Sequence, residues 1–522
     1  MRLKKNIAQV PTLKTRASGV LLHPTSLPND FAVGDLGPAS YAFVDFLSGA
    51  KQRWWQMLPV GPVGPGFSPY QALSAFAGSP LLISPELLWK NGLLDRSDLE
   101  LYKKDPSDRV DYVVASELSE RALRRAFEHF LKKRPAKSML DKFHGFIRAE
   151  HEWLDDYALF LAIRKAESGR DWTQWPSDLR LRRRPALKEA ARRFADETQF
   201  QKFVQWQFML QWNALKQYAA ERGIGLIGDV PIFVAPNSSD VWAHSCLFKL
   251  NRDGTPGVVA GVPPDYFAKS GQRWGNPHYR WDVMRRKGYR WWIERFKKTL
   301  DYFDAARLDH FIGFVRYYEV PGKSETAEHG RYRKGPGADF FKMVLRALGP
   351  VQLIAEDLGV VTPAVKMLRD EFSFPGMRVL QFAFGKDPEA DNYKPYRYVP
   401  NCVVYTGTHD NDTTVGWFND RDSPASTRSK EDIEEERQFV LKFLNSDGRD
   451  IHWAMIRAAL ESVANTAIFP MQDILGLGSA ARMNRPGTPE GNWNWRMTSL
   501  PSDELVARRL AEWTEVYGRA NR

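Results

Sequence analysis

Short apolar runs recur along the chain, and most of them end in a polar or charged residue. The eight runs are residues 19–22, 54–60, 224–227, 305–308, 352–355, 377–384, 402–405 and 466–469. Continuous apolar runs of this length are typical of strands that are buried on both faces of a parallel sheet. We therefore predict a parallel sheet of eight strands.

Helical periodicity fills the stretches between these runs. Phe200, Phe203, Val204 and Phe208 recur near the spacing of an α-helix, and Gly223 follows where a helix commonly ends. Alternating strands and helices favour an α/β fold, a (β/α)8 TIM barrel. A doubly wound open sheet is the alternative, but the chain has no Gly-x-Gly-x-x-Gly turn after its first run and no Gly-Lys-Ser/Thr phosphate loop.

The spacing of the runs is uneven, with about 160 residues between the second and the third. Amphipathic patterns there predict a mostly helical insertion at about residues 90–218. Residues 234–303 are rich in glycine, proline and aromatic side chains, which predicts an irregular lid or subdomain loop. We expect residues 1–16 to form a flexible tail and residues 17–522 to form a single barrel domain.

The composition is that of a soluble globular protein, with 43% hydrophobic and 26% charged residues. No apolar run reaches the length of a membrane span, and the basic N-terminus lacks the apolar segment of a secretory signal. The two cysteines, Cys246 and Cys402, provide no disulfide framework. These features favour a cytoplasmic location without a membrane partner.

The formal net charge is +11, which could attract nucleic acid. Much of the excess lies between residues 180 and 193, where a solvated helical face explains it at least as well. We therefore expect no nucleic-acid partner.

Three carboxylates come soon after apolar runs. Asp309 in AARLDHF and Glu356 in QLIAEDLG follow their runs directly, and Asp410 in YTGTHDN follows its run a few residues later. In a (β/α)8 barrel the active site lies at the carboxyl ends of the strands. One such carboxylate often only caps the next helix. Three of them, each beside another polar group, favour a shared catalytic site.

Two carboxyl groups suit the cleavage of glycosidic bonds, because one protonates the leaving oxygen while the other meets the charge on the anomeric carbon. Arg307 points to the same side of its strand as Asp309, and a neighbouring guanidinium favours an ionised carboxylate. We therefore assign Asp309 as the nucleophile and Glu356 as the acid/base.

Longer segments carry a resemblance to a known family. They read SGVLLHPTSLP, SPYQALSAFAGSPLLIS, GDVPIFVAPNSSDVWA, PPDYFAKSGQRWGNPHY, RLDHFIGF, AEDLG, FPGMRVLQFAF, THDNDTTVGW and PGTPEGNWNWR. Together they resemble the 4-α-glucanotransferases, the amylomaltases or disproportionating enzymes of glycoside hydrolase family 77. The resemblance runs from about residue 17 to near the C-terminus. The short motifs alone would indicate only the wider α-amylase-like group.

The resemblance implies a role for each of several residues. Asp309 matches the nucleophile that forms a covalent glucosyl-enzyme, Glu356 the general acid/base, and Asp410 the carboxylate that stabilises the transition state. Arg307 and His409 match neighbours that orient the nucleophile and bind the sugar in the cleaved subsite. Asp229 matches a polar residue that lines the same pocket, and Tyr70 matches an aromatic residue at the acceptor and donor subsites.

The stretch 259–279 matches a loop that covers the bound glucan in this family. Tyr266, Trp274 and Tyr279 could stack on sugar rings there, or they could instead pin the loop to the barrel. We expect the segment PGTPEGNWNWR to form part of one wall of the site and assign it no other role.

The implied function is a 4-α-glucanotransferase, which transfers part of an α-1,4-glucan to the 4-hydroxyl of another glucan with retention. The implied partners are maltooligosaccharides and α-1,4-glucans, with no cofactor and no metal, and the chain is expected to be a monomer or a weak homo-oligomer. An α-1,4-glucan hydrolase of the α-amylase type is the alternative. A non-catalytic glucan- or RNA-binding protein is a more distant one, which the three carboxylates disfavour.

Overall fold

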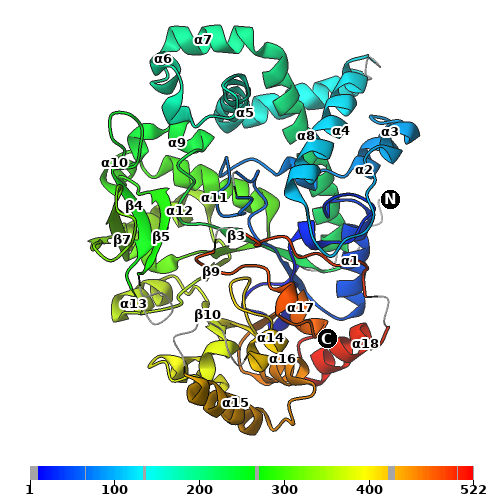
Figure 1. The fold of residues 1–522 in the computed structure, drawn as a ribbon, viewed down its shortest axis with the longest axis vertical. Helices are drawn as coiled ribbons and strands as arrows, with labels where there is room; N and C mark the ends of the chain where they lie inside the picture. The colour runs from blue at the N-terminus through cyan, green and yellow to red at the C-terminus, as the bar shows by residue number, and fades with distance from the viewer. Residues whose placement is uncertain are drawn as a thin grey trace.

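Eight parallel strands close into a barrel (Figure 1). The computed structural model describes residues 10–64, 66–132, 137–264, 270–420, 429–488, 490–501 and 504–520. The barrel strands are β1 (Ala17–Leu21), β2 (Trp54–Gln56), β3 (Gly225–Val230), β6 (Ala305–Leu308), β9 (Leu353–Ala355), β10 (Gly376–Val379), β11 (Cys402–Tyr405) and β12 (Thr466–Pro470). Their order around the barrel is β1-β12-β11-β10-β9-β6-β3-β2, so the predicted (β/α)8 fold is confirmed and the open sheet is excluded.

Every one of the eight predicted runs overlaps a barrel strand, but two strands end well before their runs do. β2 stops at Gln56, and Pro59 beyond it has no N–H group to donate to a ladder. The run at 377–384 leaves the sheet after Val379 and continues as the 3-10 helix η6 (Leu380–Ala383). A continuous apolar run shows that a segment is buried, but it does not show where the strand ends.

Helices surround the barrel between its strands. Those that follow the strands are α1 (Pro38–Gly49), α8 (Ala195–Glu221), α11 (Arg290–Tyr302), α12 (Ala338–Leu348), α13 (Pro363–Glu371), α16 (Ile451–Glu461) and α18 (Glu504–Val516). In α8 the predicted stripe is buried, and Gly223 beyond its end has a φ of +70° that glycine adopts without strain. The connection from β10 to β11 contains only the 3-10 helices η6, η7 (Ala390–Tyr393) and η8 (Pro395–Arg397).

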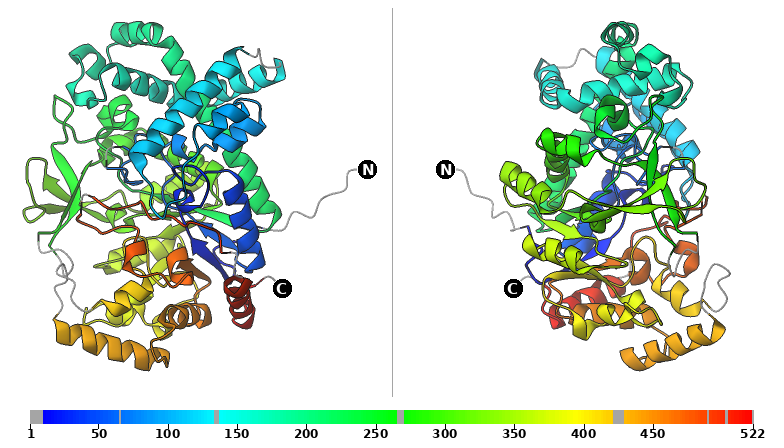
Figure 2. Two further views of the ribbon diagram at one scale, coloured as in Figure 1. Left: turned by 45° about the vertical axis from the view of Figure 1, so that its right-hand side comes forward. Right: turned by 90° about the vertical axis from the view of Figure 1, so that its left-hand side faces the viewer.

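The long connection between β2 and β3 is built mostly from helices. Besides α8 these are η2 (Pro80–Leu82), α2 (Pro85–Lys90), α3 (Arg96–Glu100), α4 (Tyr112–Lys132), α5 (Lys137–Ala166), η3 (Trp172–Gln174), α6 (Ser177–Arg180) and α7 (Arg184–Arg193). α5 packs along α8, and Figures 1 and 2 show α5 to α7 at the end of the molecule that lies opposite α15 (Lys430–Leu444).

A second, antiparallel sheet stands beside the barrel. Its order is β5 (Gln272–Pro277), β4 (Val258–Val262), β7 (Arg316–Pro321) and β8 (Arg331–Lys334). Residues 234–303 are therefore more regular than the sequence predicted, since they hold β4 and β5 as well as α9 (Ser239–Ala243), η4 (Ser245–Leu247), α10 (Trp281–Arg286) and α11. β4 pairs with β7, which lies outside this stretch, so local sequence gave no sign of the pairing.

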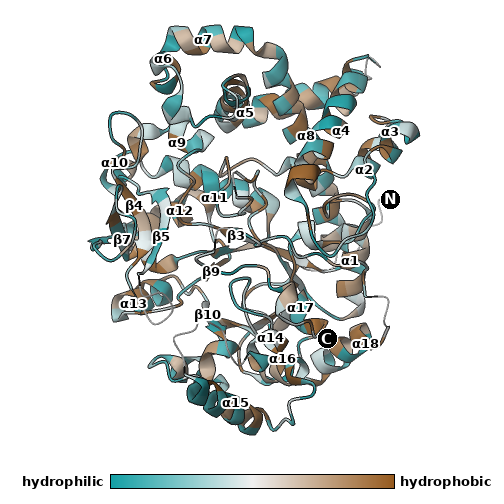
Figure 3. Cartoon of the chain, in the orientation of Figure 1, coloured by the Kyte–Doolittle hydropathy of each residue, from teal (hydrophilic) through white to brown (hydrophobic). Residues whose placement is uncertain are grey.

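The remaining elements follow the carboxyl ends of barrel strands or cover the outside. They are η1 (Pro24–Ser26), η5 (Phe311–Phe314), α14 (Thr414–Asn419), α15, α17 (Met471–Ile474) and η9 (Ser479–Ala481). Figure 3 shows α15 as largely hydrophilic. Among the described residues, none of the helices has both the length and the apolar character needed to cross a membrane.

Arg519, just beyond α18, ties the last helix to the closure of the barrel. Its guanidinium group has no exposed surface and donates to the main-chain oxygen of Ala17 in β1 and to that of Asn465 directly before β12. The other acceptors are the main-chain oxygens of Leu460, Ala459 and Ser462. One side chain thus links the first and last barrel strands to the end of α16.

Candidate active site

Asp309 and Glu356 follow neighbouring strands and lie side by side. The register of β6 and β9 pairs Leu308 with Ala355, and each of these residues directly precedes one of the two acids. Neighbouring strands are about 4.8 Å apart. The Glu356 N–H donates to the main-chain oxygen of Leu308 (3.2 Å), and the Phe311 N–H donates to that of Glu356 (3.0 Å). The backbone therefore fixes the two acids next to each other at one end of the barrel.

The Glu356 side chain sits in a setting that favours its neutral form. It is buried, and the N–H groups of His310 and Leu358 donate to its two oxygens at 2.6 and 3.1 Å. Burial raises the pKa of Glu356 to about 8 and the Asp309 carboxylate adds to this rise, whereas Arg307 and the two N–H donors oppose it. Glu356 therefore carries a proton at neutral pH, as a general acid must.

Arg307 holds two carboxylates at once. Its Nη1 donates to both oxygens of Asp229 (2.9 and 2.7 Å), and its Nη2 lies 2.9 Å from Oδ1 of Asp309. The register of β3 and β6 places Asp229 opposite Arg307. Burial lowers the pKa of Arg307, but the two carboxylates raise this pKa by more than burial lowers it, so the guanidinium stays charged. It can therefore orient Asp309 for attack on an anomeric carbon.

Tyr70 and His409 extend this network across the barrel end. The Tyr70 hydroxyl donates to Oδ2 of Asp229 (2.7 Å), which leaves its oxygen free to accept from Nε2 of His409 (2.9 Å). The two rings are stacked with their centroids 5.2 Å apart. Hydrogen bonds and ion pairs thus connect Asp309 to His409 through Arg307, Asp229 and Tyr70.

Asp410 is presented by the loop that follows β11. Asn484 Nδ2 donates to its Oδ1 (2.6 Å), and Arg482 Nη2 donates to its main-chain oxygen (2.7 Å). The Asp410 side chain is 46% exposed, so its carboxylate remains open to a ligand. The three sequence-predicted acids therefore follow β6, β9 and β11 at the same end of the barrel.

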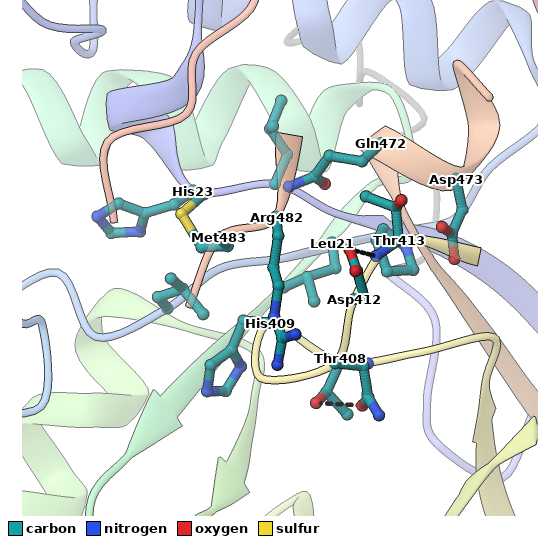
Figure 4. A pocket seen from close by; sticks show the side chains of 14 residues that line it. Leu21, His23, Thr408, His409, Asp412, Thr413, Gln472, Asp473, Arg482 and Met483 are labelled. Atoms are coloured by element: carbon teal, nitrogen blue, oxygen red, sulfur yellow. Dashed lines mark hydrogen bonds between the residues drawn. The ribbon is translucent and has the colours of Figure 1, made fainter. Parts of the chain in front are cut away.

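A pocket opens beside His409 at this end of the barrel (Figure 4). His23, Asp412, Gln472 and Arg482 are among its lining residues, and they come from the segments that follow β1, β11 and β12. A second pocket contains Tyr70 and Asp229 in its wall. Several connections therefore line pockets next to residues of the network, although none of the three acids lies in the wall of either pocket.

Trp274, in β5, reaches His310 from the second sheet. Its ring meets that of His310 edge-on, with the centroids 4.9 Å apart, and His310 directly follows Asp309. Tyr266, expected to act with it, lies outside the described residues.

Tyr279 is placed differently from the stacking role considered for it. Its ring has no exposed surface and packs among Phe233, Phe248 and Trp291, while its hydroxyl donates to the main-chain oxygen of Ile232 (2.9 Å). No face of this ring is open to a sugar, so the structure favours the alternative in which Tyr279 pins its segment to the barrel.

Sequence reasoning did not identify Asn484, Arg482 or Trp493, which lie around the acids. The Trp493 ring is 5.7 Å from that of Tyr70 and 5.9 Å from that of His409. The distinctive segment PGTPEGNWNWR was the available signal for Trp493, but only the fold shows what the segment touches.

In the described part of the chain, one group of acids and a histidine could hold a metal ion: Asp95, Asp98 and His129. It lies at α3 and α4, and both oxygens of Asp98 already accept hydrogen bonds, from Arg125 and from the Asp95 N–H. We assign no metal to it.

Comparison with known proteins gives a consistent result. The family model for 4-alpha-glucanotransferases, glycoside hydrolase family 77, matches residues 22–501. A 4-alpha-glucanotransferase of Synechocystis sp. is 46% identical over 97% of this chain and 99% of its own length. One from Thermus thermophilus is 45% identical over 96% and 99%, respectively.

Solved structures agree with this assignment. An amylomaltase from Streptococcus agalactiae in complex with acarbose is 35% identical, with a TM-score of 0.91 over 97% of this chain and 100% of that one. Amylomaltase from Corynebacterium glutamicum, 18% identical with a TM-score of 0.78 over 98% of this chain and 76% of that one, shows the same fold. The chain therefore belongs to the 4-alpha-glucanotransferase family, glycoside hydrolase family 77.

Proposed function

We propose that this protein is a 4-α-glucanotransferase that cuts an α-1,4-glucan and joins the released segment to the 4-hydroxyl of another glucan with retention of configuration. One observation carries the proposal: the register of β6 and β9 puts Asp309 and Glu356 directly after two paired strand ends. Burial supports it, because it raises the pKa of Glu356 to about 8. Adjacent carboxyl groups of this kind, one neutral and one paired with a guanidinium, suit a retaining double displacement.

In the first step Asp309 attacks the anomeric carbon through one carboxylate oxygen. The bond from that carbon to the bridging oxygen breaks, and Glu356 gives its proton to this oxygen, so the departing chain leaves with a free 4-hydroxyl group. Arg307 keeps Asp309 oriented. Asp410, with its exposed carboxylate, accepts hydrogen bonds from ring hydroxyls as positive charge grows on the sugar.

In the second step another glucan enters with its 4-hydroxyl towards the anomeric carbon. Glu356, now ionised, takes the hydroxyl proton while the oxygen bonds to that carbon, and the bond to Asp309 breaks. The enzyme returns to its starting state, and the number of glucosidic bonds is unchanged. Transfer prevails over hydrolysis only where the acceptor excludes water from the covalent intermediate.

The sugar in the cleaved subsite would contact Tyr70, Asp229, Arg307 and His409, which the network brings together. Trp274 would cover it from the second sheet. The proposed substrates are maltooligosaccharides and longer α-1,4-glucans. We also propose a cytoplasmic location, which the two free cysteines support, and a monomer or weak homo-oligomer.

Incubation with maltotriose tests the proposal. We expect glucose together with a ladder of longer maltooligosaccharides, seen by chromatography, and no products from an Asp309→Ala variant that folds normally. Glucose and maltose without longer sugars would instead identify a hydrolase and overturn the proposed transfer.

A further inference from the structure

A segment close to the C-terminus crosses the catalytic end of the barrel. We call residues 482–488 and 490–496 the brace. At its start, Arg482 Nη2 donates to the main-chain oxygen of Asp410 (2.7 Å), and Arg482 Nε donates to that of Asn484 (2.7 Å). Figure 4 shows the Arg482 side chain extending towards the loop that carries His409. One planar guanidinium therefore fixes the spacing between the Asp410 loop and the brace.

The spacing between the Asp410 loop and the brace also determines how Asn484 contacts the Asp410 side chain. Asn484 Nδ2 donates to Oδ1 of Asp410 at 2.6 Å. Because Arg482 binds the main-chain oxygens of both partners, it sets the geometry of this hydrogen bond as well as the position of the loop.

Trp493, further along the brace, packs against the other side of the site. Its ring is buried and lies against Tyr70 and His409, whose hydrogen bond belongs to the catalytic network. Its φ of +67° is unfavourable for a residue with a side chain and persists only where the surroundings impose it. The Trp493 N–H donates to the main-chain oxygen of Met483, and the Tyr112 hydroxyl donates to that of Trp493.

The far end of the brace is anchored to the connection that follows β1. The Arg496 guanidinium is buried and donates to the main-chain oxygens of Leu27, Asn29 and Phe31. The brace therefore spans from the segment after β1 to the loop after β11 and is held at both ends.

We propose that Arg482 and Trp493 are positioning residues of the transfer reaction. Arg482 acts through Asp410 and Asn484, and Trp493 acts through the Tyr70–His409 pair. This inference rests on the proposed function, because it assigns the brace to the reaction in which Asp410 stabilises the transition state.

Replacement of Arg482 gives the first test. A misplacement of about 1 Å in a catalytic group can cost about 100-fold in rate. We expect Arg482→Met to lower kcat for maltotriose transfer by about 10- to 100-fold, with KM changed by less than about threefold, because the lost interaction acts in the transition state. Arg482→Lys, which keeps the charge but not the fork of donors, should fall between Arg482→Met and the wild type.

Arg485→Met is the matched control, since Arg485 is an exposed arginine on the same brace; it should keep the wild-type kcat. An Arg482→Met variant that retains the wild-type kcat would overturn the role of Arg482. If neither the wild type nor the control forms longer sugars from maltotriose, the proposed function itself fails.

A double-mutant cycle separates positioning from a general structural effect. In an Asp410→Asn background, Arg482→Met should cost less than about threefold, because its partner has already lost its role. α-Maltotriosyl fluoride as donor keeps such slow variants measurable, since fluoride leaves without a proton. If Arg482→Met lowers kcat as much in the Asp410→Asn background as in the wild type, Arg482 does not act through Asp410.

Trp493 is tested with two replacements of different severity. Trp493→Leu should lower kcat by about tenfold or more, and Trp493→Phe, which keeps an aromatic ring, should lower it less. Circular dichroism and the unfolding midpoint show whether each variant is folded. Folded variants that both keep the wild-type kcat would overturn the role of Trp493.

Discussion

The two central acids differ in their surroundings far more than in their chemistry. Asp309 lies against the charged guanidinium of Arg307, whereas Glu356 is buried and accepts only main-chain N–H donors. Burial raises the pKa of Glu356 and so favours its protonated form, whereas Asp309 is held by its ion pair with Arg307. The sequence predicted the contact between Arg307 and Asp309, because side chains two residues apart on a strand share a face; the roles of nucleophile and acid/base stay predictions.

The pH dependence of the reaction tests this division. Since the pKa of Glu356 is raised to about 8, its acid form is present below that pH and is lost as the pH rises through it. We expect kcat/KM for maltotriose to fall on the alkaline side with a midpoint near pH 8.

Glu356→Gln provides the corresponding variant, because Gln does not titrate. It should abolish the alkaline limb and slow maltotriose transfer by about 100-fold or more. The first step with α-maltotriosyl fluoride should suffer much less, since fluoride needs no proton. An alkaline limb that persists in Glu356→Gln would mean that another group titrates there.

Other residues of the site could not be found from the sequence. Asn484 is 74 residues away from Asp410 along the chain, and their contact depends on how the last connection folds over the barrel. Tyr279 belongs to an aromatic-rich segment, and its burial depends on contacts with α11, so composition alone could not distinguish packing from sugar stacking.

At the scale of elements, continuous apolar runs were sufficient to locate the barrel strands, whereas β4 and β5 were not predicted. Barrel strands are buried on both faces, which leaves a strong local pattern. β5 (Gln272–Pro277) is only partly buried and includes a glycine and a proline, so no alternation marks it. Its pairing with β4 is what carries Trp274 to His310.

Removal of the Trp274 ring should affect the fate of the covalent intermediate. We expect Trp274→Ala to weaken glucan binding and to raise the share of hydrolysis, because water then reaches the site that the ring covers. The ratio of free glucose to ladder products from maltotriose measures this share. Trp89→Ala, a partly exposed tryptophan on α2, is the control; an unchanged ratio in Trp274→Ala would contradict the covering role.

At the scale of the whole molecule, the barrel is closed by contacts between the two ends of the chain. β1 pairs with β12, and Arg519 donates to main-chain oxygens beside both strands. A buried charge of this kind is stabilising only while its acceptors surround it. Loss of the side chain removes a donor from five main-chain oxygens, of which those of Leu460 and Ser462 still accept from Arg16.

We therefore expect Arg519→Met to lower the free energy of unfolding by at least about 2 kcal/mol. A shift of the urea midpoint to lower concentration, with kcat unchanged below the transition, would show it. Arg508→Met, on the exposed side of α18, should leave the midpoint in place. Equal midpoints for the two variants would mean that Arg519 does not secure the closure.

The pairing of Leu308 with Ala355 has a consequence for how this family can diversify. The proposed reacting groups, Asp309 and Glu356, directly follow two short neighbouring strands, whereas the proposed covering residue Trp274 comes from β5 in the second sheet. Mutations in that outer sheet can change which chains are accepted without altering the acidity or the spacing of the pair. Chain-length preference can therefore drift between relatives, or be engineered, while the bond-breaking step stays the same.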